Sequence, residues 1–546
     1  MFPKVLLRCV FLCLAVTCVT AVGFRPGYAS PADSETPVDL RQAVHSGVEL
    51  ERSHNWLDAI EHYEKSVKSF PDSRELEYGL RRAKIHFGIE RRYSDTSFLK
   101  TMLVMSPREA MSLFEEVSTK VQSSYVDSLS ATSYVAHGTE SLYLALSEQR
   151  FLDRNVSARY VPQVSRVRRQ LRDEFWNRPI SHRDGSRDTI NQVCQLMQSQ
   201  LGISATPVIL EYVFGGCNSL DDYSSCLTPG RLNDLYGNIE GQFVGLGIEM
   251  KSEAGKGLLL VNVIPDSPAA EAGLLAGEHI VKVDGTDCRQ LTTEEAAGLL
   301  QGLEGSRAAL EIFNSMNNRT RKVTVGRRAV TVKSVPVIRM LDREAGIGYV
   351  QLTSFQKTSA QEMDAALTQL RQQGMRSLVW DVRGNPGGLL TTAVEILDRF
   401  IGEGVLVSTR GRTSDQNFSY SAHRPGTWDM PLVLLVDGDS ASASEIVAGA
   451  VRDHRRGTIV GRKSFGKWSV QSIFPISGDS GLRLTTAKFY SPHGHTYGKI
   501  GIAPDVAVAA PKQHRTYFRA PTDVSLEGDA DVEQALEVLR RQTAAR

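Results

Sequence analysis

The chain has 546 residues, a length that corresponds to three or four domains. Its content of 41% hydrophobic and 23% charged residues is that of an ordinary globular protein. Lys plus Arg number 63 and Asp plus Glu number 62, and no block of basic residues is present. This balance argues against nucleic acid as a partner.

The N-terminus has the pattern of an export signal. Lys4 and Arg8 are followed by an apolar run from Cys9 to Gly23. Residues 1–29 are therefore expected to be a signal peptide, cleaved before Ser30 or after Ala21. An uncleaved anchor is the alternative, because the run is near the lower length limit of a membrane-spanning helix. The expected location is the periplasm or cell envelope, with membrane contact only through this segment if it stays uncleaved.

Four cysteines lie beyond that segment: Cys194, Cys217, Cys226 and Cys288. In an exported chain Cys217 and Cys226 are close enough in sequence to form a disulfide, but spacing alone does not establish one. No CxxC or His-rich pattern is present, so we expect no metal site and no cofactor.

A helical region is expected over residues 38–107. Gly47, Ala59, Tyr63 and Pro71 have the spacing of a tetratricopeptide (TPR) helix pair, and residues 75–89 resemble part of a second. Such arrays usually need three repeats to bury a continuous core, so an ordinary helical hairpin is an equal alternative. A TPR-like region would offer a surface for an adaptor protein. Residues 108–236, an N-terminal protease region, carry apolar residues at helical spacing and are expected to be mostly helical.

Residues 237–330 alternate short β-type runs with Gly and Pro, and include one helix predicted over Thr293–Leu300. Through "VGLG" and "SPAAEAGLLAGEHIVKVDG" this segment resembles a PDZ domain. The resemblance implies that loop N–H groups hold a peptide's terminal carboxylate, while the next strand pairs with the peptide. The residues expected to bind substrate are Val244, Gly245, Leu246, Gly247, Ile248, Ala297 and Leu300. Their apolar character predicts a small or aliphatic last residue.

Strands and helices then alternate over residues 331–512, an α/β core. "GIGYVQL", "SLVWDV" and "PLVLLVD" are predicted strands, and Ser359-x-x-Glu362 is predicted to be a capping box that begins a helix ending near Gln373. Residues 513–546 form a tail with a helix. The predicted fold is multidomain α+β, and its active site should lie at the strand ends of the core.

Three serines, Ser440, Ser442 and Ser444, stand between a predicted strand and the predicted helix "ASEIVAGAVRD". Ser442-x-x-Glu445 fits a capping box, so an N-cap is one interpretation. The position also suits an acyl-transfer nucleophile, because developing negative charge would meet free N–H groups and the positive end of the helix dipole.

The base for such a nucleophile is not an evident histidine. His454 lies about three turns along the same helix, too far from Ser442, and no G-x-S-x-G motif is present. Lys467, between Phe465 and Trp468, is the better candidate. A lysine acts as a general base only where desolvation or nearby positive charge lowers its pKa, and aromatic neighbours would provide a dry site. A solvated loop charge is the alternative.

The tract "SASASEI", the later "FGK" and "VQ", "DVRGNPGGLL" at 381–390 and "GIAPDV" at 501–506 together resemble the carboxyl-terminal (tail-specific) processing serine proteases, a PDZ-containing Ser/Lys family with a crotonase-like core. The match runs from about residue 241 to 509. The resemblance implies that Ser442 is the nucleophile, that Lys467 is the base, and that Gln471 orients Lys467.

The same resemblance makes Asp453 a supporting residue. The alternative for Asp453 is a helix-end carboxylate paired with Arg452 or Arg455. Gly387 or Gly388, with the N–H of Ala443, is expected to form the oxyanion hole, because glycines let the backbone approach a carbonyl closely. Trp468 departs from the family pattern, which has a small residue after the lysine. It is expected either to narrow the site or to improve the lysine's desolvation.

The sequence therefore predicts a serine endopeptidase that recognises the C-terminal tail of protein substrates through a PDZ domain and cleaves near it. Its partners would be proteins with free, apolar C-termini. A catalytically inactive PDZ and helical-repeat scaffold of the cell envelope is the alternative. A trypsin-like PDZ protease would need a His/Asp/Ser domain before the PDZ and a GNSGG motif, and neither is found.

Overall fold

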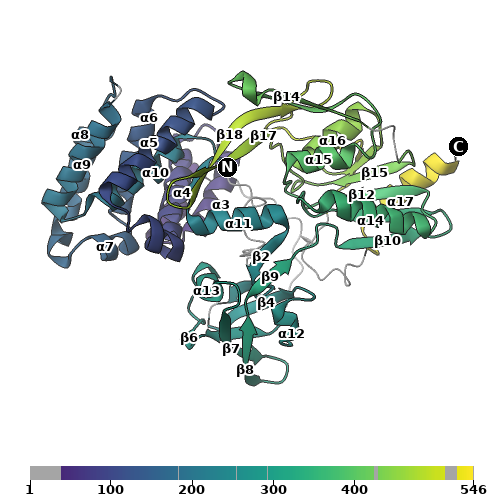
Figure 1. Ribbon diagram of the computed structural model, residues 1–546, viewed down its shortest axis with the longest axis horizontal. Coiled ribbons are helices and arrows are strands. Elements are labelled where there is room, and N and C mark those ends of the chain that lie inside the picture. The colour runs from purple at the N-terminus through teal and green to yellow at the C-terminus, as the bar shows by residue number, and fades with distance from the viewer. Residues whose placement is uncertain are drawn as a thin grey trace.

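The computed structural model describes residues 39–182, 184–253, 255–291, 293–423, 428–510 and 526–544. The predicted signal segment lies outside these residues. Figure 1 shows a helical part at one end, an α/β core at the other, and a smaller β-rich part below them. The predicted multidomain α+β fold is confirmed. Within the described residues, no helix combines the length and the apolarity needed to span a bilayer.

The helical part begins with three packed helices. Tyr63 is fully buried, and its ring packs against Gly47 and Gly79. A Cβ at either glycine would lie only 2.3 or 2.5 Å from the ring. The third helix also packs against later helices instead of continuing an array. The elements are α2 (Leu40–Arg52), α3 (Trp56–Ser69), α4 (Arg74–Ser94), η1 (Phe98–Met102), α5 (Pro107–Ser124), α6 (Ala131–Ala145), α7 (Gln149–Asn155), η2 (Ala158–Gln163), α8 (Val164–Phe175), α9 (Gly185–Leu201), α10 (Ala205–Gly216), η3 (Cys217–Ser219) and α11 (Pro229–Glu240).

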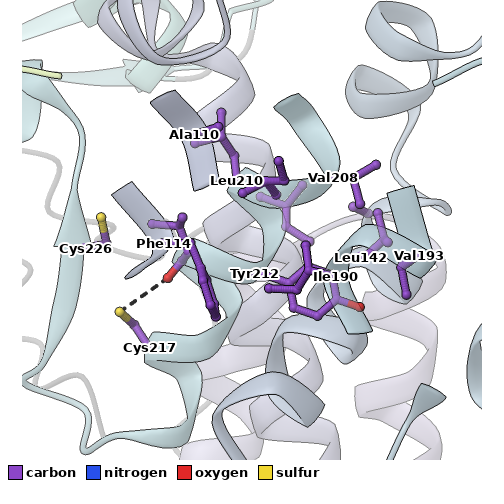
Figure 2. Close-up of a cluster of buried hydrophobic side chains, with 14 of the residues drawn as sticks. Ala110, Phe114, Leu142, Ile190, Val193, Val208, Leu210, Tyr212, Cys217 and Cys226 are labelled. Atoms are coloured by element: carbon purple, nitrogen blue, oxygen red, sulfur yellow. Dashed lines mark hydrogen bonds between the residues drawn. The ribbon is translucent and has the colours of Figure 1, made fainter. Parts of the chain in front are cut away.

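The core of this part surrounds α10, which packs against α5, α6 and α9. Phe114, Leu142 and Tyr212 belong to its buried apolar cluster (Figure 2). Cys217 and Cys226 lie at the edge of the same cluster as free, buried thiols. Cys194 and Cys288 are also free and buried, so the structure contains none of the disulfides that these four cysteines would allow.

The β-rich part, residues 242–331, is a sheet of order β3-β4-β5-β7-β8, with β6 beside β5. Strand β3 is an edge strand, and α13 packs against it. A separate pair, β2-β9, leads back to α11 and the core. The elements are β2 (Gln242–Gly245), β3 (Ile248–Glu253), β4 (Gly257–Val263), α12 (Pro268–Glu271), β5 (His279–Val283), β6 (Thr286–Asp287), α13 (Thr293–Leu300), β7 (Arg307–Asn314), β8 (Arg319–Gly326) and β9 (Arg328–Thr331). The predicted helix is confirmed by α13.

The core sheet has the order β10-β11-β12-β15-β16-β19 and is parallel except for the β10–β11 pair. One face buries α14, α15 and α16, and the other face is covered by the C-terminal helix α17. The elements are β10 (Val337–Asp342), β11 (Ile347–Gln351), α14 (Ser359–Gln372), β12 (Ser377–Asp381), α15 (Leu390–Leu397), β15 (Leu432–Val436), α16 (Ala443–Asp453), β16 (Thr458–Gly461), β19 (Val506–Ala507) and α17 (Ala530–Ala544). The three predicted strands are confirmed.

A second sheet joins the core to the helical part, and its long β17–β18 ribbon runs between them in Figure 1. Strand β18 pairs with β1, β13 and β17. The elements are β1 (Ser225–Leu227), β13 (Val405–Gly411), η4 (Ser414–Gln416), β14 (Phe418–Ser421), β17 (Ser469–Ile476) and β18 (Ser480–Tyr490). Strand β1 thus brings a loop of the helical part beside a core strand.

One predicted capping box is wrong. Helix α14 begins at Ser359, but Thr358 occupies the N-cap position. The Ser359 hydroxyl instead donates to the carbonyl of Ser354 and accepts from the N–H of Gln356. The Glu362 carboxylate accepts from the Thr358 hydroxyl. Both side chains of the predicted box therefore have other partners, a competition that local spacing does not reveal.

Candidate active site

The three serines of the tract between β15 and α16 differ in their surroundings. Ser440 and Ser444 are fully buried, and their hydroxyls donate to the backbone carbonyls of Val382 and Asn385, each at 2.8 Å. Ser442 is only partly buried and lines a cavity of about 230 Å³. Its φ of 57° lies in the left-handed region, a conformation that costs about 1–3 kcal/mol and is common at active sites.

The cavity collects residues from distant parts of the chain. Its walls come from α11, the loop after β12, the start of α16, and strands β17 and β18. Six of the seven predicted catalytic and oxyanion residues line it: Ser442, Lys467, Gln471, Gly387, Gly388 and Ala443. Because these residues span more than one element, the cavity is a product of the fold and not of one local motif.

Lys467 is a buried side chain, only 6% exposed, so the alternative of a solvated loop charge is wrong. Its Nζ lies 4.7 Å from the centroid of the Tyr223 ring, within the range of a cation–π interaction. Burial, with the nearby charges of Asp221 and Glu445, raises the pKa of Tyr223 to about 12. Tyr223 is therefore a neutral phenol near neutral pH, and its ring forms one wall around the lysine.

Glu445 connects the serine to the lysine. Its fully buried carboxylate accepts from the N–H of Ser442 (2.9 Å), the N–H of Lys467 (2.8 Å), the N–H of Gly466 (2.6 Å) and the hydroxyl of Ser464 (2.6 Å). Burial raises the pKa of Glu445 to about 7, although the four hydrogen bonds oppose that rise. The sequence showed Glu445 only as half of a capping box; its bonds to the lysine loop could not be inferred from that spacing.

Two backbone N–H groups beside Ser442 are available. The N–H of Gly387 donates to Asn385 Oδ1 at 2.8 Å. The N–H groups of Gly388 and Ala443 donate to no group among the residues that the structure describes. Gly388 has a φ of +147°, and a Cβ there would lie 2.2 Å from the carbonyl oxygen of Phe355. Only glycine fits this position.

Gln471 lines the cavity, and its amide nitrogen donates to Ser469 Oγ at 2.9 Å and Thr485 Oγ1 at 3.2 Å. These bonds fix the amide on the face of the β17–β18 ribbon that meets the cavity. Its role in orienting Lys467 stays a prediction.

Asp453 lies at the end of α16 and is not among the residues that line the cavity. Its carboxylate accepts from the Ser491 hydroxyl and from the N–H of His493. The expected alternative pairing with Arg452 or Arg455 is wrong, since Asp453 holds the turn after β18 instead. A supporting role for Asp453 in catalysis stays a prediction.

Trp468 points into the core behind the lysine. Its ring stacks on Phe489 at 4.5 Å and meets Tyr497 edge-on at 4.9 Å. It is 4% exposed and does not line the cavity. Trp468 therefore does not narrow the site, and it keeps water from the core side of the loop that carries Lys467.

A second pocket, of about 40 Å³, lies between β3 and α13 in the β-rich part. All seven residues predicted to bind substrate line it: Val244, Gly245, Leu246, Gly247, Ile248, Ala297 and Leu300. The N–H groups of Leu246 and Gly247 donate to no group in the described part of the chain. Gly247 has a φ of +81°, and a Cβ there would lie 2.1 Å from that of Ser267. The pocket thus combines apolar walls with free amide donors.

Among the described residues, no three His, Cys, Asp or Glu side chains are grouped as metal ligands would be. The cavity at Ser442 instead brings together a hydroxyl, a buried amine, a buried carboxyl group and free N–H groups. These groups are the components of nucleophilic acyl transfer.

Two parts of the chain match known families. Residues 346–508 match the model of peptidase family S41, and residues 260–312 match that of the PDZ domain. A carboxy-terminal-processing protease of Bartonella bacilliformis is 39% identical over 298 residues, 54% of this chain and 68% of the relative. A carboxyl-terminal-processing protease of Synechocystis is 30% identical over 366 residues, 66% of this chain and 80% of the relative.

Among solved structures, the photosystem II D1 C-terminal processing protease is 27% identical, with a TM-score of 0.39, and the match covers 74% of this chain and 94% of that one. The sequence relatives establish the family, because this chain covers more than two thirds of their length. The chain belongs to peptidase family S41 and is a serine-type peptidase with a PDZ domain.

Proposed function

We propose that this protein is an endopeptidase that binds the C-terminal tail of a protein substrate in its PDZ pocket and cleaves near that tail with Ser442 and Lys467. One observation carries the catalytic assignment. Ser442 is the serine of the tract that lines the cavity, and it shares that cavity with the buried amine of Lys467 and the free N–H groups of Gly388 and Ala443.

In the proposed reaction the Ser442 hydroxyl attacks the peptide carbonyl while the neutral amine of Lys467 accepts its proton. Lys467 then gives the proton to the leaving amine, and water hydrolyses the acyl-enzyme. The N–H groups of Gly388 and Ala443 would bind the oxyanion, with the positive end of the α16 dipole behind Ala443. Glu445 would keep the serine and the lysine loop in register through their backbone N–H groups.

The PDZ pocket supports the tail-specific part of the proposal. The free N–H groups of Leu246 and Gly247 would hold the terminal carboxylate, and the open edge of β3 would pair with the peptide. The apolar walls around Ile248 and Leu300 favour a small or aliphatic last residue. The partners would therefore be proteins with free, apolar C-termini.

We place the enzyme in the periplasm or cell envelope on the pattern of residues 1–29, with membrane contact through that segment where it is not cleaved. The helices α2–α4 would offer a docking surface for an adaptor protein.

The catalytic proposal is tested by incubating the purified protein with unstructured polypeptides that differ only in an apolar or a charged C-terminal residue. Mass spectrometry of the products locates the cleaved bonds. We expect cleavage of the apolar-tailed substrate near its C-terminus and none by Ser442→Ala. Cleavage that ignores the tail, or that persists in the Ser442→Ala variant, would contradict the proposal.

Binding by the PDZ pocket is tested separately, on the inactive Ser442→Ala protein. Fluorescence anisotropy compares one peptide as the free acid and as the C-terminal amide. Amidation removes the charge that the loop N–H groups would hold and should weaken binding by about 1.5–3 kcal/mol, the range of charge-assisted hydrogen bonds. Equal affinities would leave tail recognition without support.

A further inference from the structure

Arg483 stands where two cavities of this protein meet. It lies on β18 and lines the catalytic cavity of about 230 Å³. It also lines a larger cavity of about 450 Å³, which is bordered by α4, the segment 217–228 and α11. Leu235 and Asn238 of α11 line both cavities too. The two cavities thus adjoin, and Arg483 is the basic side chain that lines both.

The charge of Arg483 is poorly compensated by the protein. Its Nη2 donates to Ser225 Oγ at a long 3.4 Å, and its Nε is shielded from solvent and bonds no described group. No described carboxylate is within ion-pair distance. Asp221 is close enough to act on its charge, yet burial outweighs that effect and lowers the pKa of Arg483 to about 10. Arg483 is therefore a half-buried cation without an ion pair among the described residues, and such a group is costly unless it is paired or functional.

Among the other arginines of the larger cavity, Arg81 and Arg92 are ion-paired with Glu140 and Glu211. Arg231 repeats the pattern of Arg483, because its Nη1 is shielded from solvent and bonds nothing in the described part of the chain. Six basic and four acidic described side chains line the cavity. Among the acidic ones, Asp95 is already bonded to the hydroxyls of Ser97 and Thr228. Planar guanidinium donors without partners fit a carboxylate.

We propose that Arg483 is a specificity-determining residue of this protease, and that it binds an acidic side chain of the substrate beside the scissile bond. The inference rests on the proposed function and adds a substrate class to it. In the β17–β18 ribbon, Gln471 is opposite Thr485 and Ile473 is opposite Arg483. Arg483 therefore lies two residues, about 7 Å, further along the ribbon than the Gln471–Thr485 pair and on the same face. That distance places the acidic residue within about three residues of the cleaved bond.

The test uses one peptide sequence with a fixed, free apolar tail, so that tail binding is the same throughout. A single glutamate is moved through the positions on either side of the scissile bond, and each peptide has a glutamine counterpart. The ratio of kcat/KM for the glutamate and glutamine peptides is measured for the wild-type enzyme, Arg483→Gln and Arg483→Lys. Lys488→Gln is the matched control, because Lys488 is an exposed cation on the same strand that lines neither cavity.

We expect a glutamate preference of about tenfold or more at one position in the wild-type enzyme and in Lys488→Gln, the lower end of the range for a charge-assisted hydrogen bond. Arg483→Gln should bring the ratio close to one, and Arg483→Lys should keep a preference of the same sign. Because each ratio is taken within one protein, a general loss of stability does not imitate this result. No preference at any position, or a preference that survives in Arg483→Gln, would overturn the proposal.

A failure of the proposed function can be distinguished from a failure of the Arg483 proposal. If the wild-type enzyme cleaves none of the peptides, the proposed function fails, and Arg483 is then judged by binding. Anisotropy on Ser442→Ala, with amidated glutamate and glutamine peptides that the PDZ pocket does not capture, should show tighter binding of the glutamate form. That difference should vanish when Arg483→Gln is added, and equal binding would refute the role of Arg483.

Discussion

Replacing Glu445 with glutamine should remove a defined part of the pH dependence of stability. Burial raises the pKa of this carboxyl group from its ordinary value of 4.5 to about 7 in the folded protein. A group whose folded pKa is raised binds its proton more tightly in the folded state, so its contribution is complete below pH 4.5 and is lost as the pH rises through 7. A rise from 4.5 to about 7 corresponds to about 3 kcal/mol.

The measurement is the thermal stability of the wild-type protein and of Glu445→Gln at several pH values between 4.5 and 8. Tryptophan fluorescence follows the transition, because Trp468 is buried in the core beside the lysine loop. Between these limits the wild-type protein should lose about 3 kcal/mol more stability than the variant. If stability falls with pH in the same way in the wild-type protein and in Glu445→Gln, the four hydrogen bonds to Glu445 fully offset its burial, and this reasoning is refuted.

Three further predictions concern the cavity. Ser442→Ala should abolish cleavage in a peptide assay. Ser440→Ala and Ser444→Ala should stay active and lose about 0.5–1.5 kcal/mol of stability, because each removes one buried hydrogen bond from a carbonyl that keeps a backbone N–H donor; equal loss of activity from Ser440→Ala would mean that the nucleophile is misassigned. Lys467→Arg should be inactive in the same assay although it keeps the charge, because arginine does not deprotonate in proteins; an active variant would exclude the proposed base. Tyr223→Leu should move the acidic limb of the plot of kcat/KM against pH to lower pH by about one pH unit, because no ring face then stabilises the ammonium form of Lys467. Tyr223→Phe keeps the ring and should leave the limb in place. Identical profiles for the two variants would show that the ring only packs.

Local patterns were sufficient for much of the fold. The alternation of buried strands and helices predicted β11, β12, β15 and α16, since each rests on hydrophobic runs that end at turn residues. Seven of the residues that line the PDZ pocket were also named, through the resemblance of one loop and one helix to a PDZ domain. Three serines within five positions could not be separated by pattern, because only their tertiary partners distinguish them.

The remaining parts depend on contacts between distant segments. Tyr223 reaches Lys467 because β1 pairs with β18, a partnership that links residue 225 to residue 483. The C-terminal helix α17 belongs to the core because Asp529 and Asp531 form ion pairs with the buried Arg383, two residues after the end of β12. Neither pairing leaves a periodic trace in the sequence.

The central claim is most directly tested by the initial rate of cleavage of one apolar-tailed substrate, prepared as the free acid and as the C-terminal amide, by the wild-type protein and by Ser442→Ala. We predict rapid cleavage of the acid and at least tenfold slower cleavage of the amide by the wild-type protein, in line with the loss of a charge-assisted hydrogen bond. Ser442→Ala should cleave neither form. Equal rates for the two forms, or residual cleavage by Ser442→Ala, would contradict a tail-specific protease that works through Ser442.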